Sequence, residues 1–121
     1  MYLGTSNNDT MYGSSNRDTM YGFRGADMMR GNGRADSVNG DGGRDRLSGG
    51  RGDDAVNGGD ADDVVAGNSG RDKLNAGNGD DRVEAADGMI DVITCGNGNH
   101  DLVVFDAGMD NFRECEIRDP R

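Results

Sequence analysis

Apolar side chains recur at every ninth position along most of this 121-residue chain. From Gly4 to Glu84 the sequence divides into nine units of nine residues, and the eighth position of every unit is apolar. In four of the nine units a polar residue stands on either side of it, and in two others Thr precedes it and Tyr follows it. Such alternation is typical of a short strand with one inward-facing side chain. We therefore predict a three-residue strand around each of Met11, Met20, Met29, Val38, Leu47, Val56, Val65, Leu74 and Val83.

The first six positions of each unit predict a turn. The first position is Gly in eight of the nine units, and the sixth is Asp in all nine. Glycine often occupies the fourth position as well, which favours a left-handed backbone there. Asparagine tolerates that conformation, so we expect it also at Asn7, Asn16 and Asn99. Arg34 and Ala61 tolerate it less well, and we expect strained or differently shaped turns at these two fourth positions.

The repeat continues less regularly beyond Glu84. Asp91 and Ile93 follow after a one-residue slip, and Asp101 and Val103 belong to a further unit. We place the repeat region at residues 1–104 and a segment that caps its open apolar end at residues 105–121. Because residues 1–3 occupy the last three places of a unit, we expect a fused or neighbouring domain N-terminal to Met1.

A strand of three residues buries nothing by itself, so the units must stack. Two nine-residue units with their turns at opposite edges make one coil, and stacked coils give two parallel sheets. Parallel crossovers favour right-handed winding. The predicted fold is all-β: a parallel β-roll, a right-handed β-solenoid with a short C-terminal cap.

Composition changes this picture in one respect. Leu, Ile, Val and Phe make up only 18 of 121 residues, and the formal net charge is −10. Ordering costs on the order of 1.5 kcal/mol per residue, more than so small a core offsets. Something besides apolar burial must therefore stabilise the fold. The acidic chain also argues against binding nucleic acid, and no apolar run is long enough for a membrane span.

The unit resembles the RTX, or haemolysin-type calcium-binding, nonapeptide repeat GGxGxDxUx, where U is a large apolar residue. Residues 49–57, GGRGDDAVN, match at every specified position, and the likeness extends over about 100 residues of the chain. Thr5, Ser14 and Phe23 depart from it at the second position. The resemblance implies a non-catalytic repeat module that folds after export and supports secreted enzymes, toxins or adhesins.

The aspartates predict a metal centre for a physical reason. Stacked coils place the sixth-position carboxylates in a column along each edge, about 5 Å apart, where they repel one another. Ca²⁺ accepts six to eight oxygen ligands in flexible geometry, whereas Mg²⁺ requires a tight octahedron. Zn²⁺ and copper need His or Cys clusters that this chain lacks. The predicted calcium ligands are Asp9, Asp18, Asp27, Asp36, Asp45, Asp54, Asp63, Asp72, Asp81, Asp91 and Asp101.

The sites are not expected to be equal. We expect the strongest ones at Asp36/Asp54, Asp45/Asp63, Asp54/Asp72 and Asp63/Asp81, where both turns are well formed, and weaker ones at Asp9/Asp27 and Asp18/Asp36. Five ions would cancel the net charge of −10. The alternative is a metal-free solenoid in which each aspartate binds its own turn. The neighbouring carboxylates at the fifth position are either solvated or additional ligands; these are Asp53, Asp62 and Asp80.

The two cysteines, Cys95 and Cys115, stand near the last repeat and in the predicted cap. A disulfide between them would hold the cap on the last coil, and free thiols are the alternative. A bridge agrees with an oxidising extracellular setting, so we expect a secreted protein.

Three functions are compatible with these observations. The first is a calcium-binding module that folds when Ca²⁺ binds. The second is an enzyme or an accessory fragment of a secreted hydrolase; against catalysis stand the missing nucleophile grouping and the thin core. The third is a surface-binding solenoid, such as an adhesin, glycan-binding or ice-binding module. Thr10 and Thr19 favour it, but the seventh positions form no regular ladder.

Overall fold

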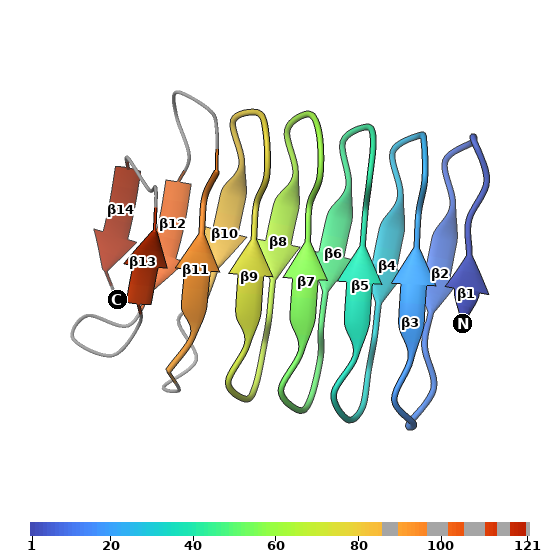
Figure 1. The fold of residues 1–121 in the computed structure, drawn as a ribbon, viewed down its shortest axis with the longest axis horizontal. Coiled ribbons are helices and arrows are strands. Elements are labelled where there is room, and N and C mark those ends of the chain that lie inside the picture. Colours follow the sequence, from blue (N-terminus) through green and yellow to red (C-terminus); the bar gives the residue numbers. More distant parts are fainter. Residues whose placement is uncertain (86–89, 97–101, 106–110, 114–116, 121) are drawn as a thin grey trace.

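The computed structural model of the chain is a parallel β-solenoid with two seven-stranded sheets (Figure 1). It describes residues 1–85, 90–96, 102–105, 111–113 and 117–120. One sheet contains β1 (Tyr2–Leu3), β3 (Thr19–Tyr21), β5 (Ser37–Asn39), β7 (Ala55–Asn57), β9 (Lys73–Asn75), β11 (Val92–Thr94) and β13 (Asn111–Arg113). The other contains β2 (Thr10–Tyr12), β4 (Met28–Arg30), β6 (Arg46–Ser48), β8 (Val64–Ala66), β10 (Arg82–Glu84), β12 (Leu102–Phe105) and β14 (Ile117–Pro120).

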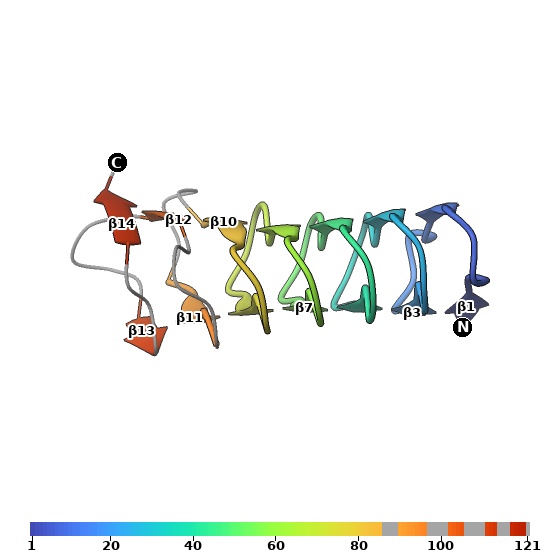
Figure 2. The same ribbon diagram turned by 90° about the horizontal axis from the view of Figure 1, so that it is seen from above.

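Successive strands alternate between the two sheets, which face each other as two layers along the length of the molecule (Figure 2). Within a sheet every strand pairs in parallel with the strand one coil away, so Val38 lies beside Val56, two repeat units later in the chain. The predicted all-β fold, its parallel sheets and its coil of two nine-residue units are confirmed.

The coil lengthens where the repeat becomes irregular. Val92 pairs with Lys73, which adds one residue to that coil, and Leu102 pairs with Arg82, which adds two. The strands stay in register because the inserted residues fall between strands. The sheets also continue beyond the predicted boundary at residue 104, since β13 pairs with β11 and β14 pairs with β12. The capping role of residues 105–121 stays a prediction.

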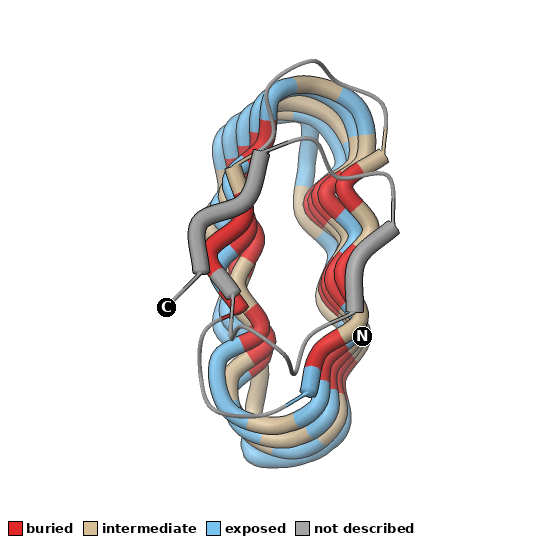
Figure 3. The backbone as a smooth tube through the Cα atoms, turned by 90° about the vertical axis from the view of Figure 1, so that its left-hand side faces the viewer, coloured by how far each residue is buried: buried red, intermediate tan, exposed pale blue. Residues whose placement is uncertain are grey.

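The apolar core lies between the sheets and consists of two facing rows of side chains, one from each sheet. The eighth-position residues from Met20 to Val83 are at most 2 % exposed, and Ile93 and Val103 continue the two rows. Viewed along the solenoid, the buried residues lie on the two long sides, where they alternate with outward-facing residues, and the two turn edges are mostly exposed or intermediate (Figure 3). Met11, in the first coil, packs against this core but is only partly buried.

The fourth-position glycines have positive φ as predicted, namely Gly25, Gly43, Gly52, Gly70 and Gly79. Arg34 and Ala61 adopt the same conformation, with φ of 68° and 69°, so their turns keep the common shape and carry strain. For Asn7 and Asn16 the prediction is wrong, because neither has positive φ. In these two turns a second-position hydroxyl accepts the amide hydrogen of the asparagine, at 3.0 Å in each case, and shapes the turn differently.

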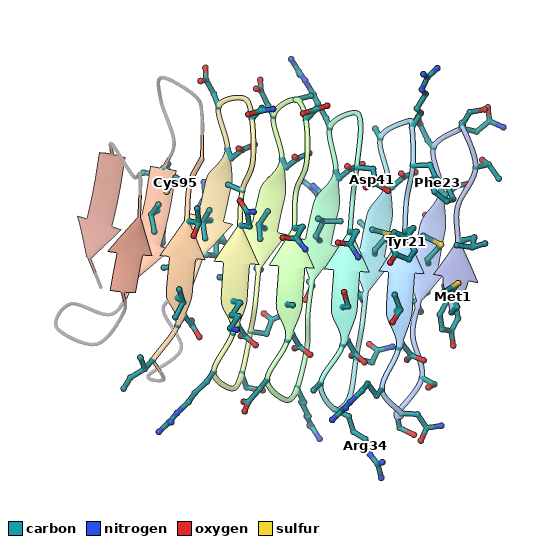
Figure 4. All side chains as sticks on the ribbon, viewed as in Figure 1. Met1, Tyr21, Phe23, Arg34, Asp41 and Cys95 are labelled. Carbon is teal, nitrogen blue, oxygen red and sulfur yellow. The ribbon has the colours of Figure 1, made fainter. Side chains whose placement is uncertain are left out.

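The second position of later turns is also left-handed, which was not predicted although glycine occupies this position in several units. Gly50, Gly59 and Gly77 adopt it, and so do Phe23, Asn32, Asp41 and Asn68. Phe23 is the bulkiest of these residues, and its ring stacks on Tyr21 with the ring centroids 6.2 Å apart (Figure 4). This stacking offsets part of the strain of a positive φ at an aromatic residue.

Strand β8 allows a direct test of the core assignment, because it carries one inward and one outward valine. Val65 is fully buried, whereas the adjacent Val64 is partly exposed on the outer face. We expect Val65→Ala to lower the free energy of unfolding in saturating calcium by on the order of 2 kcal/mol, since it leaves a cavity. Val64→Ala should have a much smaller effect. Urea denaturation of both variants checks this, and equal losses would contradict the assigned orientation of the strand.

Candidate metal centre

The sixth-position aspartates form one column along each turn edge of the solenoid. Each of them directly precedes a strand, and strand pairing stacks them one coil apart. From Asp27 to Asp81 they are at most 3 % exposed; Asp18 is 8 % exposed and Asp91 is fully buried. Asp9, in the first turn, is only partly buried, and Asp101 lies outside the described residues. The structure therefore brings together ten of the eleven predicted ligand residues, as two buried carboxylate columns.

One carboxylate oxygen of each aspartate binds the neighbouring turn. Oδ1 accepts a hydrogen bond from the backbone N–H of the aspartate one coil earlier; for example, Asp36 N–H donates to Asp54 Oδ1 at 2.7 Å. Eight such bonds of 2.7–2.9 Å follow the two columns. This ladder was not predicted. Sequence spacing indicates that the aspartates stack, but not that a side chain reaches the backbone of the next coil.

The second carboxylate oxygen is what makes the columns unusual. Oδ2 of Asp27, Asp36, Asp45, Asp54 and Asp63 is buried without a hydrogen-bond partner. It lies against the Cα of the first-position glycine of its own turn, where an added methyl group would overlap it, as at Gly49 beside Asp54. Burying a carboxylate oxygen without a partner is costly unless a cation or a donor reaches it. The described residues thus contain a row of buried oxygen atoms suited to a cation.

Backbone carbonyls supply further oxygen atoms close to these turns. Carbonyls of the second and fourth positions point along the solenoid axis at the next turn. A side chain at Gly43 would overlap the carbonyl oxygen of Gly25, and one at Gly59 would overlap that of Asp41. No group of three or more His, Cys, Asp or Glu side chains suited to a metal occurs in the described part of the chain. The candidate ligands are therefore paired carboxylates and carbonyls, which suit Ca²⁺ and not Zn²⁺. The second-position carbonyls of Phe23, Asn32, Asp41 and Gly59 each accept a backbone N–H from the next turn, so one lone pair of each is already used.

Electrostatics in the absence of a cation oppose ionisation of these groups. Burial, together with the carboxylates of neighbouring coils, raises the pKa of Asp45 and Asp54 from 3.8 to about 7 and that of Asp63 to about 8. The hydrogen bond from the neighbouring backbone acts in the opposite direction but is the weaker influence. The metal-free roll therefore carries ionised carboxylates at neutral pH only at the expense of stability.

The fifth-position carboxylates are differently placed. Asp53 and Asp62 are exposed, and each accepts a hydrogen bond from a backbone N–H of the next turn, at 2.9 Å from Arg71 and 2.8 Å from Asp80. Asp62 also forms an exposed ion pair with Arg44 at 3.8 Å. These contacts agree with a solvated side chain that links two turns.

The structure describes only one of the two cysteines of the predicted disulfide. Cys95 follows β11 and is fully buried beside the core, whereas Cys115 lies outside the described residues. The pairing of the two cysteines stays a prediction.

Comparison with protein families agrees with the geometry of the site. The family model described as RTX calcium-binding nonapeptide repeat (4 copies) matches residues 3–33, 30–65 and 57–88. These ranges cover more than half of the chain, which therefore belongs to the RTX calcium-binding repeat family. Repeats of this family bind several Ca²⁺ ions per array, so the protein contains a calcium-binding repeat module of a non-catalytic, structural type.

A comparison with curated proteins gives no match. Among the described residues no helix is long and apolar enough to cross a membrane.

The raised pKa values predict how the metal-free protein responds to pH. Between the unfolded value of 3.8 and the folded values of about 7 to 8, the folded state holds protons that the unfolded state has lost. In metal-free buffer, acidification from about pH 8 to about pH 4.5 should therefore increase the free energy of unfolding and the β-sheet content. Far-UV circular dichroism with urea measures both.

Asp63→Asn provides the control for this experiment. It removes the carboxyl group with the highest of the three pKa values and keeps an oxygen to accept the amide hydrogen of Asp45. The variant should show a shallower dependence on pH. A loss of sheet structure on acidification of the parent protein would contradict the prediction.

Proposed function

We propose that this protein is a folding module that becomes ordered when calcium binds between successive turns of each edge. The observation that supports the proposal most strongly is the row of buried Oδ2 atoms without a partner at Asp27, Asp36, Asp45, Asp54 and Asp63. Bound there, Ca²⁺ would supply the positive charge that these oxygens lack. The sixth-position carboxylates would hold it together with carbonyl oxygens of the second and fourth positions, an all-oxygen set of the kind Ca²⁺ prefers.

The proposed sites use pairs of aspartates that are one coil apart on the same edge. Five such pairs lie in the regular turns with left-handed second and fourth positions: Asp27/Asp45, Asp36/Asp54, Asp45/Asp63, Asp54/Asp72 and Asp63/Asp81. Five ions would carry ten positive charges, equal in size to the net charge of −10. Asp91 extends one column, and Asp101 is proposed as a ligand from its place in the repeat alone.

Binding and folding are coupled in this proposal. Most strands contribute one inward side chain to the core, and the chain has few Leu, Ile, Val and Phe residues for its length. Such a core does not offset the entropy of ordering, and the carboxylate columns add repulsion. The chain is then disordered without the metal and forms the roll with it, because the free energy of binding contributes directly to folding.

The proposed setting is extracellular. If the sites resemble those of extracellular modules, their dissociation constants are about 10⁻⁴ to 10⁻³ M, which keeps them empty at cytosolic calcium levels and fills them outside the cell. Family membership supports this setting, since such repeats typically occur in secreted proteins. We propose a structural role without catalysis, in support of a neighbouring domain or of another secreted protein.

Calcium titration tests the proposal. We expect the far-UV circular dichroism spectrum to be that of a disordered chain in chelator and to become β-like at about millimolar Ca²⁺. Mg²⁺ at the same concentration should produce little change, because it requires six ligands in tight octahedral geometry. A β-like spectrum of full amplitude in chelator at neutral pH would contradict coupled folding.

Paired variants test which carboxylates hold the ion. Asp54→Asn keeps Oδ1 for the bond from the Asp36 amide but replaces the unpartnered Oδ2, so it should raise the calcium midpoint several-fold. Asp53→Asn is the matched control, since it removes the same charge from the adjacent exposed residue and also keeps its backbone bond. Its midpoint should stay near that of the parent. Equal shifts would indicate that total charge, and not ligand position, determines calcium affinity.

We also propose the Cys95–Cys115 bridge. A disulfide closing a loop of this length would contribute about 3 kcal/mol. The intact mass of the oxidised protein should be lower by two hydrogens than that of the reduced protein, and iodoacetamide should label it only after reduction and unfolding. Labelling of both thiols in the unreduced, unfolded protein would show that they are free. Cys115→Ser should lower thermal stability only under oxidising conditions.

A further inference from the structure

The solenoid contains two kinds of turn. Every turn from residues 22–27 to residues 76–81 has positive φ at both its second and its fourth position. The first two turns, residues 4–9 and 13–18, have it at neither. The difference follows the sequence, because these two turns carry Thr5 or Ser14 at the second position and asparagine at the fourth.

The carboxylate of the first two turns is satisfied within the turn itself. Asp9 Oδ2 accepts the backbone N–H of Thr5 at 2.6 Å, and the Thr5 hydroxyl lies 3.1 Å from the same oxygen. Asp18 Oδ2 accepts the backbone N–H of Ser14 at 2.6 Å and lies 3.1 Å from its hydroxyl. In later turns, from Asp27 to Asp63, the corresponding oxygen has no partner.

The same hydroxyl also binds the backbone of its own turn. Besides donating to the carboxylate, it accepts the amide hydrogen of the residue two positions later, Asn7 or Asn16. Its single proton and one of its lone pairs are therefore both used inside the turn. A calcium ligand must direct its oxygen lone pairs at the ion, whereas Oδ2 of these two aspartates already accepts a backbone N–H at 2.6 Å. The hydroxyl proton is shared by both carboxylate oxygens: the hydroxyl lies 3.1 Å from each oxygen of Asp9, and 3.3 Å and 3.1 Å from Oδ1 and Oδ2 of Asp18.

We infer that the Thr5 and Ser14 hydroxyls take the place of calcium in the first two turns, so that Asp9 and Asp18 are not calcium ligands. This inference rests on the proposed calcium sites and limits their extent. The first calcium ligands are then Asp27 on one edge and Asp36 on the other. The two turns of the first coil are stabilised by hydrogen bonds alone. The roll then has one end whose turns do not depend on calcium, against which the calcium-dependent coils stack.

Two sets of variants test the inference through the number of ions bound per chain. Asp9→Asn with Asp18→Asn should leave the stoichiometry unchanged, whereas the matched pair Asp45→Asn with Asp54→Asn should lower it. Conversely, replacing Thr5, Asn7, Ser14 and Asn16 with Gly restores the repeat pattern in both turns. This variant should bind about one additional ion for each restored turn. Isothermal titration calorimetry and equilibrium dialysis with elemental analysis both count the ions.

Two single substitutions at Thr5 test the role of the hydroxyl even if the multiple variants fail to fold. Thr5→Val removes the hydroxyl with little change in shape, and Thr5→Ser keeps it. In saturating calcium, Thr5→Val should lower the urea midpoint and Thr5→Ser should restore it, with the same stoichiometry in both.

The outcomes separate this inference from the proposed function. A parent chain that binds calcium but loses ions in Asp9→Asn with Asp18→Asn would overturn the inference alone, and so would an unchanged stoichiometry in the folded glycine variant. A parent chain that binds no calcium would overturn the proposed function and the inference together.

Discussion

The structure depends on how each sixth-position aspartate uses its two carboxylate oxygens. One oxygen accepts an amide hydrogen from the previous coil, which fixes the spacing between turns along both edges. From Asp27 to Asp63 the other oxygen is buried without a hydrogen-bond partner. These hydrogen bonds therefore hold the carboxylates in closely spaced columns, but they do not neutralise their negative charge. Stacking and charge repulsion arise from the same side chain, and a cation bound at the proposed sites would relieve the repulsion.

The turns accept backbone strain to achieve this stacking. Glycine fills many of the left-handed positions, but Phe23, Arg34 and Ala61 adopt positive φ as well. Successive turns pack so closely that several glycines leave no room for a side chain. A side chain at Gly52, for example, would overlap the carbonyl of Arg34. Close packing between coils thus overrides local preference, at a cost that the thin core does not offset alone.

The first coil closes its turns with a different backbone shape and different chemistry. Thr5 and Ser14 provide a hydroxyl and an amide hydrogen to the carboxylate of their own turn, and no left-handed residue is needed there. A hydroxyl group and a cation meet the same requirement, since both bring positive charge density to Oδ2. With calcium at the proposed sites, the solenoid would combine turns closed by their own hydrogen bonds with turns that bind an ion.

The sequence by itself determined the parallel two-sheet roll, the coil of two repeat units, the inward apolar residues and the stacking of the aspartates. Each of these follows from period and side-chain type, which a nine-residue repeat records directly. Tertiary structure alone decided what the aspartate oxygens contact, that the second position is left-handed, and that Asn7 and Asn16 are not. These features depend on atoms contributed by the adjacent coil or on a choice between two turn shapes. A one-dimensional pattern places residues on an edge, but it does not specify which oxygen faces which donor across a gap of one coil.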